Sequence, residues 1–331
     1  MKKNNELNLE TICIQGGWKA KKGEPQVLPI YQSTTFRYET SDQMGRLFDL
    51  EEEGYFYTRL QNPTNDTVAK KIARLEGGVA AILTSSGQAA SMYAILNIAG
   101  AGDHIISSCN IDGGTFNLFS VTLKKIGIDC TFIDPDASEE EIQKSFKPNT
   151  KALFGETISN PGLAILDIEK FARIAHQNGV PLIVDNTFAT PINCRPFEWG
   201  ADIVTHSTSK YMDGHATQVG GAIVDSGNFD WDAHADKFPG LTSPDESYHG
   251  LIYTKKFGPN AYIVKATVQL MRDMGSIPSP FNCFLLNLGL ETLHLRVPRH
   301  CENAEKVAAF LNDDPRIAWV NHSSLEDNKY H

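Results

Sequence analysis

The sequence lacks the features that mark several large classes of protein. None of its six cysteines pairs with another in a Cys-x-x-Cys motif, and none has the spacing of a metal site. A chain of 331 residues is too long to depend on a disulfide framework, so we expect free thiols in a reducing compartment. No apolar run approaches the length of a membrane span, and residues 1–10 lack the apolar core of a secretory signal. These absences predict a cytoplasmic protein without a metal.

Basic residues are also scarce, with 30 Lys and Arg against 40 Asp and Glu and a formal net charge of −10. Nucleic acid or an anionic membrane as the main partner would call for a basic surface, so both are disfavoured. A small-molecule substrate is not excluded, because local charge decides its binding. The hydrophobic content of 41% is ordinary for a globular enzyme, and the length allows two domains or one large and one partial.

The chain divides into three stretches. Residues 1–65 have weak periodicity and many turn formers, which predicts an arm that lies on another part of the protein or on a neighbouring subunit. Residues 66–260 alternate helical patterns with short apolar strands. This alternation predicts an α/β fold with a mainly parallel sheet and helices on both faces. Residues 261–331 are mostly helical and look like a C-terminal subdomain that ends early.

The expected elements can be given by their ranges. Periodicity predicts helices at 65–76, 88–99, 116–126, 139–146, 168–178, 260–274, 281–295 and 303–311. Short apolar runs predict strands at 79–83, 104–107, 130–133, 152–156, 182–184, 203–205 and 221–224, with one more at Trp319 and Val320. In an open α/β sheet, ligands bind beyond the carboxyl ends of the strands, so the residues that follow these strands are the candidate site.

Two of the predicted strands end in residues of complementary chemistry. Residues 204–210 finish in two hydroxyls and the amine of Lys210, and residues 181–185 finish in the carboxylate of Asp185. A lysine amine can form an imine with an aldehyde, and a carboxylate can keep a pyridine nitrogen protonated. The pair therefore favours pyridoxal 5′-phosphate as cofactor. The alternative is two ordinary core strands that end in polar loop residues.

Two segments could hold the phosphate of such a cofactor. Ser86 can cap a helix that opens at Gly87 and Gln88, whose free N–H groups would form an anion site. Ser207 and Ser209 alternate, so in an extended chain both hydroxyls would point to the same side. The alternatives are an ordinary capped turn and serines that satisfy loop backbone.

Further candidates follow other strands or lie on the arm. Thr187 stands two residues after Asp185, and Asn160 could donate to the phenolic oxygen of the cofactor, although Asn-Pro is also a common turn initiator. Tyr57 and Arg59 share a face of the arm, and a guanidinium suits phosphate. The alternative for this pair is a surface strand with a solvated arginine.

Taken together and in this order, these segments resemble the Cys/Met-metabolism family of pyridoxal-phosphate enzymes. The family includes cystathionine γ-synthase, cystathionine lyases, methionine γ-lyase and O-acetylhomoserine sulfhydrylase, and the resemblance runs from residues 29–36 to the C-terminal helices. It implies the aspartate-aminotransferase-like fold type I of PLP-dependent transferases. It also implies roles for individual residues: Lys210 carries the cofactor, Asp185 pairs with the pyridinium, Gly87, Gln88, Ser207 and Ser209 hold the phosphate, and Tyr57 and Arg59 reach the phosphate in the neighbouring subunit. A dimer would then be the minimal active unit, and a tetramer built from dimers the usual state.

Within the family, residues 237–242 and 244–250 resemble O-acetylhomoserine sulfhydrylase more than the lyases, as do 279–282 and 289–293. The resemblance implies a γ-replacement in methionine biosynthesis, in which O-acetyl-L-homoserine and sulfide give L-homocysteine and acetate. Lys210 would act as general base and acid. The alternatives are methionine γ-lyase or cystathionine γ-synthase activity, or a catalytically impaired homologue that binds the cofactor.

The sequence departs from the family pattern at two places. Asp112 stands before Gly-Gly-Thr, where the family has a tyrosine that stacks on the cofactor and assists proton transfer. A carboxylate cannot stack, so we expect weak cofactor retention or low turnover. The chain also has no residue that corresponds to the family's arginine for the substrate α-carboxylate, which implies a fragment or a shortened copy.

Overall fold

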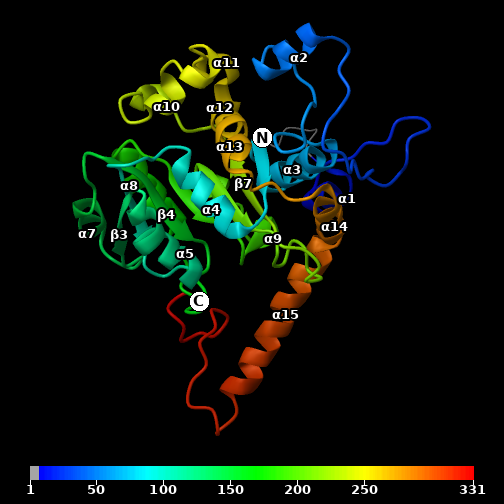
Figure 1. Ribbon diagram of the computed structural model, residues 1–331. Helices are drawn as coiled ribbons and strands as arrows, with labels where there is room; N and C mark the ends of the chain where they lie inside the picture. Colours follow the sequence, from blue (N-terminus) through cyan, green and yellow to red (C-terminus); the bar gives the residue numbers. More distant parts are fainter. Residues whose placement is uncertain (1–6) are drawn as a thin grey trace.

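The computed structural model describes residues 7–331 and contains one seven-stranded sheet with helices packed on both sides (Figure 1). The strand order is β1-β7-β6-β5-β4-β2-β3. The strands are β1 Ala80–Thr84, β2 His104–Ser108, β3 Asp129–Ile133, β4 Thr150–Glu156, β5 Leu182–Asp185, β6 Ile203–Ser207 and β7 Gly221–Asp225. β7 is antiparallel to both of its neighbours, and every other pair is parallel. The prediction of a mainly parallel α/β sheet is confirmed.

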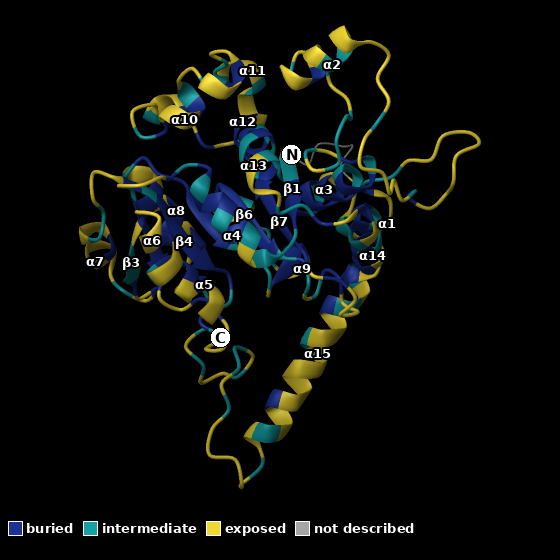
Figure 2. Ribbon diagram, in the orientation of Figure 1, coloured by how far each residue is buried: buried dark blue, intermediate teal, exposed yellow. Residues whose placement is uncertain are grey.

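Successive residues of each strand enter different cores on the two sides of the sheet, as the pleat requires. On β5, Ile183 packs into one hydrophobic cluster while Leu182 and Val184 pack into another. The cluster of Ile183 lies under α4 (Gly87–Leu96) and α12 (Ala261–Lys265). The opposite side is covered by α3 (Pro63–Glu76), α8 (Ile168–Gln177) and α14 (Pro280–Glu291). Figure 2 shows the strands as the buried layer between these helices.

Local sequence explains where α3 begins and ends. The side chain of Asn62 accepts a hydrogen bond from the N–H of Thr64, and Pro63 fits the first turn because its missing N–H would have no partner there. The helix ends at Gly77, whose φ of 80° is a left-handed conformation that glycine adopts without a Cβ clash. α3 thereby carries one apolar face onto the sheet, which explains why its existence is predictable from sequence.

Several predicted elements have different bounds in the structure. The predicted helix 116–126 is α5 (Gly113–Asn117), the π-helical segment η1 (Leu118–Thr122) and α6 (Leu123–Lys125). The predicted helix 260–274 is α12, the π-helical segment η6 (Ala266–Met271) and α13 (Arg272–Met274). The predicted helix 281–295 ends at Glu291 in α14, and α15 (Leu293–Asn312) contains the predicted helix 303–311.

The two ends of the chain hold structure that the sequence pattern did not indicate, or lack an element that it did. Within the predicted arm, the structure has α1 (Leu9–Gln15) and α2 (Ser41–Phe48), and α1 buries Ile12 and Cys13 in the core. The strand expected at Trp319 and Val320 is absent, because the segment pairs with no other strand and Trp319 is 76% exposed. In Figure 1, α15 runs away from the sheet and the following segment turns back to end near α5.

The remaining helical segments are short. They are α7 Glu139–Lys144, α9 Thr190–Asn193, α10 Pro239–Thr242, α11 Tyr253–Phe257, and the 3-10 segments η2 Pro196–Trp199, η3 Asp232–His234, η4 Glu246–Tyr248 and η5 Gly258–Asn260. Among residues 7–331, no helix combines the length and apolar character needed to cross a membrane.

Candidate active site

Three neighbouring strands, β4, β5 and β6, end in polar side chains on the same face of the sheet. The parallel register pairs Glu156 with Asp185, and Asp185 with Thr205. Residues in register on adjacent strands point to the same side, and Ile183, two residues before Asp185, packs under α4. The carboxyl ends of these strands and the start of α4 therefore face one another.

The carboxyl group of Asp185 is held by hydrogen bonds from its own strand end and from β6. Oδ1 accepts from the N–H of Thr187 at 2.9 Å, and Oδ2 accepts from the hydroxyl of Thr205 at 3.4 Å. Burial raises the pKa of Asp185, while the bonds from Thr187 lower it. A cation beside this carboxylate would stabilise its charged form, and a protonated pyridine nitrogen is such a cation.

The start of α4 lies against the end of β6. The hydroxyl of Ser86 accepts a hydrogen bond from the N–H of Ala89 at 3.1 Å and caps the helix, as predicted. The N–H groups of the first turn, including those of Gly87 and Gln88, have no acceptor within the helix. A Cβ at Gly87 would lie 2.6 Å from the Cβ of Ser207, so only glycine permits this approach. These N–H groups and the Ser207 side chain form a place where an anion can bind.

Lys210 follows β6 in a turn, with its backbone N–H 3.4 Å from the carbonyl of Ser207. The side chain is exposed, and within residues 7–331 its amine forms no hydrogen bond or ion pair. Thr187 completes the connection, because its hydroxyl accepts from the N–H of Ser207 at 2.8 Å. The structure thus links Lys210, Ser207, Thr187 and Asp185 in one cluster beside α4.

Ser209 does not lie as the alternation argument predicted. β6 ends at Ser207, and Ser209 belongs to the turn that follows, so the two serines are not on one extended strand. The hydroxyl of Ser209 donates to the carbonyl of Gly220 at 3.3 Å and accepts from its N–H at 3.0 Å. The serine therefore fixes the turn to the segment before β7.

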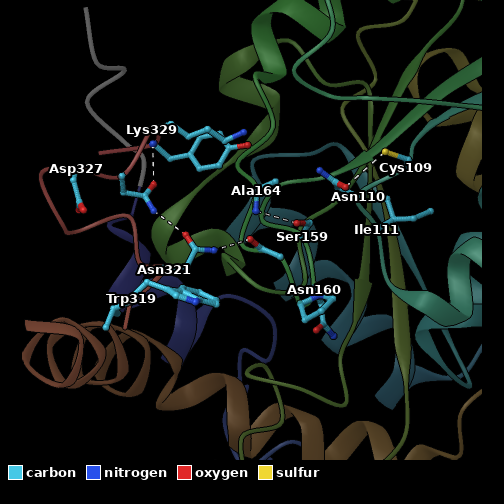
Figure 3. A pocket seen from close by; sticks show the side chains of 15 residues that line it. Cys109, Asn110, Ile111, Ser159, Asn160, Ala164, Trp319, Asn321, Asp327 and Lys329 are labelled. Carbon is cyan, nitrogen blue, oxygen red and sulfur yellow. Dashed lines mark hydrogen bonds between the residues drawn. The ribbon is translucent and has the colours of Figure 1, made fainter. Parts of the chain in front are cut away.

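Asn160 lies in a loop beyond β4 and lines a cavity of about 650 Å³ (Figure 3). The peptide bond between Asn160 and Pro161 is cis. The other wall of the cavity comes from Trp319 and the C-terminal segment, where the amide of Asn321 donates to the carbonyl of Gly162 at 3.1 Å. Of the residues that the sequence selected for the cofactor, only Asn160 lines this cavity.

Tyr57 and Arg59 also lie outside that cluster. The guanidinium of Arg59 sits 5.2 Å from the centre of the Tyr57 ring, which confirms that the two side chains share a face. Arg59 also donates to the carbonyl of Arg272 at the start of α13. In the part of the chain that the structure describes, no hydrogen bond or ion pair joins either residue to Lys210 or Asp185.

Asp112 is used by the fold as a helix cap. Its Oδ1 accepts from the N–H of Gly114 at 2.8 Å and from that of Thr115 at 3.2 Å, at the start of α5. The side-chain amide of Gln88 donates to Thr115 at 3.0 Å and lies 3.5 Å from Asp112. The carboxylate is therefore directed toward its own helix, although it stays next to the first turn of α4.

The sequence reading missed several side chains that support the cluster. Thr205 and Glu156 flank Asp185 on the neighbouring strands. On the opposite face, His206 of β6 lies 2.6 Å from Glu76 of α3, with both side chains buried. Arg296 of α15 donates to the carbonyl of Tyr211 at 2.7 Å, directly after Lys210, and to that of Gly289 at 2.7 Å. In the sequence, the one pattern that could have identified such supporting residues is a polar residue inside an apolar strand. This pattern identifies Thr205 and His206 but not Arg296.

The arrangement fits a phosphorylated pyridine aldehyde. It offers the exposed amine of Lys210 in the turn after β6, the carboxyl group of Asp185 on the adjacent strand β5, and a helix start held close to β6 by Gly87. Among residues 7–331, no group of three or more His, Cys, Asp and Glu side chains is placed to bind a metal ion.

Comparison with known proteins gives one family and relatives over nearly the whole chain. The model of the Cys/Met metabolism PLP-dependent enzymes matches residues 10–331. A homocysteine/cysteine synthase from Kluyveromyces lactis is 44% identical over 327 residues, which is 98% of this chain and 73% of that protein. An O-acetyl-L-homoserine sulfhydrylase from Corynebacterium glutamicum is 47% identical over 331 residues, which is 99% of this chain and 76% of that protein.

Solved structures agree with this result. An O-acetylhomoserine (thiol)-lyase from Campylobacter jejuni, which carries N'-pyridoxyl-lysine-5'-monophosphate, superposes with a TM-score of 0.95 at 41% identity and covers 98% of this chain and 80% of that chain. A second structure, from Corynebacterium glutamicum, has a TM-score of 0.81 at 32% identity and covers 97% of this chain and 73% of that chain.

Proposed function

Because the chain belongs to the Cys/Met metabolism family of PLP-dependent enzymes, we propose that it catalyses γ-replacement on O-acetyl-L-homoserine. Sulfide replaces the acetyl ester oxygen at the γ-carbon, so the products are L-homocysteine and acetate. The relatives named homocysteine synthase and O-acetyl-L-homoserine sulfhydrylase support this choice within the family. The protein is a transferase with pyridoxal 5′-phosphate as cofactor, and its substrates are small molecules.

One observation carries the proposal, which is the meeting of Lys210, Asp185 and the first turn of α4 on one face of the sheet. Cofactor binding in this proposal uses Lys210 for the covalent bond and Asp185 for the ring nitrogen. The phosphate is held by the N–H groups of Gly87 and Gln88 and by the side chain of Ser207. These residues come from β5, β6 and α4, all within residues 66–260, which we propose as the cofactor domain.

The remaining predicted residues take supporting roles in the proposal. Thr187 joins Asp185 to the backbone of Ser207, and Ser209 fixes the turn that carries Lys210. Asn160 is proposed to donate to the phenolic oxygen of the cofactor from the loop beyond β4. Its place beside a cavity at the carboxyl end of the sheet supports that role.

When bound, pyridoxal 5′-phosphate supplies an aldehyde for the lysine amine and a ring that accepts electrons from the substrate α-carbon. The carboxylate of Asp185 keeps the ring nitrogen protonated by charge pairing. The amine of Lys210 would remove the α-proton of the substrate and move protons at the β-carbon as general base and acid. Acetate leaves with the bonding electrons from the γ-carbon, and HS⁻ forms the new bond there.

Two measurements test the function. Purified protein with O-acetyl-L-homoserine and sulfide should release homocysteine and acetate in equal amounts, and methionine alone should give neither methanethiol nor a keto acid. The Lys210→Ala variant should lose the absorbance band of the lysine-bound cofactor and all turnover. Lys256→Ala, a change on the exposed surface of α11, is the matched control and should keep both. A wild-type protein without that band would contradict the proposal.

A second candidate, a cofactor-binding protein with impaired catalysis, is favoured by one observation. Asp112 caps α5 and supplies no ring to stack on the cofactor. We expect Asp112→Tyr to raise cofactor retention or turnover by about fivefold, since one stacked ring contributes about 1 kcal/mol. Asp112→Asn keeps a capping oxygen and removes only the charge. A gain in the tyrosine variant alone assigns the deficit to the missing ring, and no gain in either variant contradicts this explanation.

We also propose that Tyr57 and Arg59 serve the cofactor of a neighbouring subunit in a dimer, and that dimers form a tetramer. Their separation from the Lys210 cluster of the same chain supports this. Neither Arg59→Ala nor Lys210→Ala should be active alone, but subunits of both, mixed and reassembled, should regain up to about a quarter of wild-type activity if each site takes its residues from two chains. Failure of the mixture to regain activity, with dimers present by light scattering, would contradict the proposal.

A cytoplasmic location is likewise proposed from the six unpaired cysteines.

A further inference from the structure

Glu156 is a buried carboxyl group that the proposed chemistry does not use. It is the last residue of β4, it pairs in register with Asp185 on β5, and it is 8% exposed. Because β4 and β5 are parallel, the two side chains extend from the same face of the sheet, at the carboxyl ends of their strands. A carboxyl group in this place lies beside the one that the proposed function assigns to the cofactor's ring nitrogen.

The Glu156 side chain joins two loops. Its Oε1 accepts a hydrogen bond of 2.7 Å from the N–H of Asp112, in the loop after β2. The main-chain N–H of Asn160, in the loop after β4, lies close enough to the carboxyl group to lower its pKa. These are the loops that carry the residue at the ring-stacking position and the residue proposed for the phenolic oxygen. One side chain therefore holds the loop after β2 by a hydrogen bond and lies beside the loop after β4, next to Asp185.

The charged groups around Glu156 are all negative. Burial, the neighbouring Asp185 on β5 and Asp112 after β2 raise the pKa of Glu156 to about 8. The carboxylate of Asp185 accepts hydrogen bonds from the N–H of Thr187 and the hydroxyl of Thr205. The pair is therefore best satisfied at neutral pH with the negative charge on Asp185 and the proton on Glu156.

We propose that Glu156 is a positioning residue that works in its protonated, neutral form, tying the loops after β2 and β4 to the strand end and leaving Asp185 as the ionised partner of the cofactor's ring nitrogen. This inference rests on the proposed function for the role of Asp185. The protonation of Glu156 does not, because it follows from groups of this chain alone. If Glu156 lost its proton, three carboxylates would repel one another where the loops meet.

The first test uses the protein without cofactor, so its outcome does not depend on the proposed function. The folded state raises the pKa of Glu156 above its ordinary value, so unfavourable charge builds up as pH rises and is complete above pH 8. Glu156→Gln keeps the shape and cannot ionise. It should leave the midpoint of thermal unfolding unchanged at pH 5 and raise it at pH 9. Glu305→Gln, on the exposed surface of α15, is the control and should leave the midpoint unchanged at both pH values.

A direct reading comes from infrared spectroscopy of the unsubstituted protein. The protonated carboxyl band that disappears in Glu156→Gln should be present at pH 7 and should titrate near pH 8. A band that is already ionised at pH 6 would overturn the inference. This measurement is made on the wild-type chain as well as the variant, so an unstable variant does not remove the answer.

The second test uses pyridoxal 5′-phosphate itself. Glu156→Gln should bind it within about twofold of wild type at pH 7, because the neutral amide replaces a neutral acid. Its advantage over wild type should grow to about threefold or more at pH 9, where the wild-type carboxyl ionises. Glu156→Ala, which releases both loops, should bind about tenfold more weakly at every pH, and Glu156→Gln should restore the wild-type level.

The outcomes separate the two proposals. If wild type binds no cofactor while the infrared band titrates near pH 8, the proposed function fails and the protonation of Glu156 stands. If wild type binds the cofactor through Lys210 but Glu156→Gln loses tenfold or more at pH 7, the carboxylate form is needed and this inference is overturned. Equal affinities of wild type, Glu156→Gln and Glu156→Ala would remove the positioning role.

Discussion

The two edges of the sheet both bury carboxyl groups, but they treat them differently. At the carboxyl edge of the parallel strands lie Glu156 and Asp185. At the amino edge lie Asp202, just before β6, and Asp225, which pairs with Ile203 because β7 is antiparallel. All four side chains belong to the same sheet, and burial raises the pKa of each. Burial alone therefore does not distinguish the site.

At the amino edge, each carboxyl group has at least one hydrogen-bond partner from the fold, although Oδ2 of Asp225 is buried without one. Oδ2 of Asp202 accepts from the N–H of Leu182 at 2.8 Å and lies 2.8 Å from Nε2 of His176. Oδ1 of Asp225 accepts from the N–H of Gly227 at 2.8 Å. The carboxyl edge adds the exposed amine of Lys210 and the N–H groups of Gly87 and Gln88, for which residues 7–331 provide no hydrogen-bond partner. The comparison indicates that a functional site combines a buried carboxyl group with neighbouring polar groups that have no hydrogen-bond partner in the described chain.

The largest expected effect separates the edges by catalysis. Asp185→Asn should lower kcat/KM by about 10²- to 10³-fold, because a neutral amide no longer holds the ring nitrogen protonated. The free energy of unfolding at pH 7 should not fall, since a buried charge is removed. Asp202→Asn is the control at the other edge, and it should lower stability without changing the rate per folded molecule. Equal rate losses in both variants would contradict the comparison.

Gly87→Ala should have the next largest effect. The added Cβ would lie 2.6 Å from the Cβ of Ser207, so α4 must move away from β6. We expect a loss of about 1–3 kcal/mol in stability from overpacking and weaker binding of pyridoxal 5′-phosphate by tenfold or more. Gly100→Ala, where a Cβ meets nothing within 4 Å, is the matched control. Calorimetry and cofactor titration measure both effects, and unchanged affinity would show that the first turn of α4 is not the phosphate site.

His176→Ala tests the amino edge by pH. Asp202 raises the pKa of His176 through their hydrogen bond, so this contact stabilises the fold fully below the histidine's ordinary pKa and is lost as pH rises through the folded value. Because His176 is half exposed, the loss should be only about 1 kcal/mol near pH 5.5 and smaller at pH 9. Denaturant unfolding at both pH values measures it, and a larger loss at pH 9 would contradict the assignment. Catalysis should not change.

Asp225→Asn should have the smallest effect and the opposite sign. Burial raises the pKa of Asp225 to about 7, so the folded state carries an unfavourable charge above that pH. The variant keeps an oxygen for the N–H of Gly227 and should gain about 1 kcal/mol of stability at pH 8, with little gain at pH 5. Cofactor affinity should not change. A loss of stability at pH 8 would indicate that the charged carboxylate has a partner at this edge.

The sequence predicted which segments meet at the carboxyl edge of the sheet better than it predicted the positions of individual side chains there. Asp185 and the Gly87 turn follow from strand ends and capping patterns, because these are local features that the chain shows directly. Ser209 was misplaced, since the alternation argument requires an extended strand and β6 ends two residues earlier. Glu156 stood at the end of a correctly predicted strand, but only the register with β5 brings it beside Asp185.

The ends of the chain were predicted least well. α1 is a helix of seven residues, which is too short for periodicity to identify. The helix is stabilised because Ile12 and Cys13 are buried in the hydrophobic core. The apolar pair Trp319 and Val320 has strand character, yet a strand needs a partner and none is beside it. In both cases the tertiary environment, which a local pattern does not contain, decides the outcome.

The position of β7 has a consequence for how the protein comes into being. β1 is the first strand to be synthesised, but its only neighbour in the sheet is β7, the last. Until residue 225 has left the ribosome, the edge of β1 stays unpaired, and α4, which follows β1, lacks its packing contact with β7. Such late pairing of distant segments slows folding and exposes an unpaired edge. The nascent chain should therefore acquire its capacity for the cofactor in a single late step, and not gradually as its strands emerge.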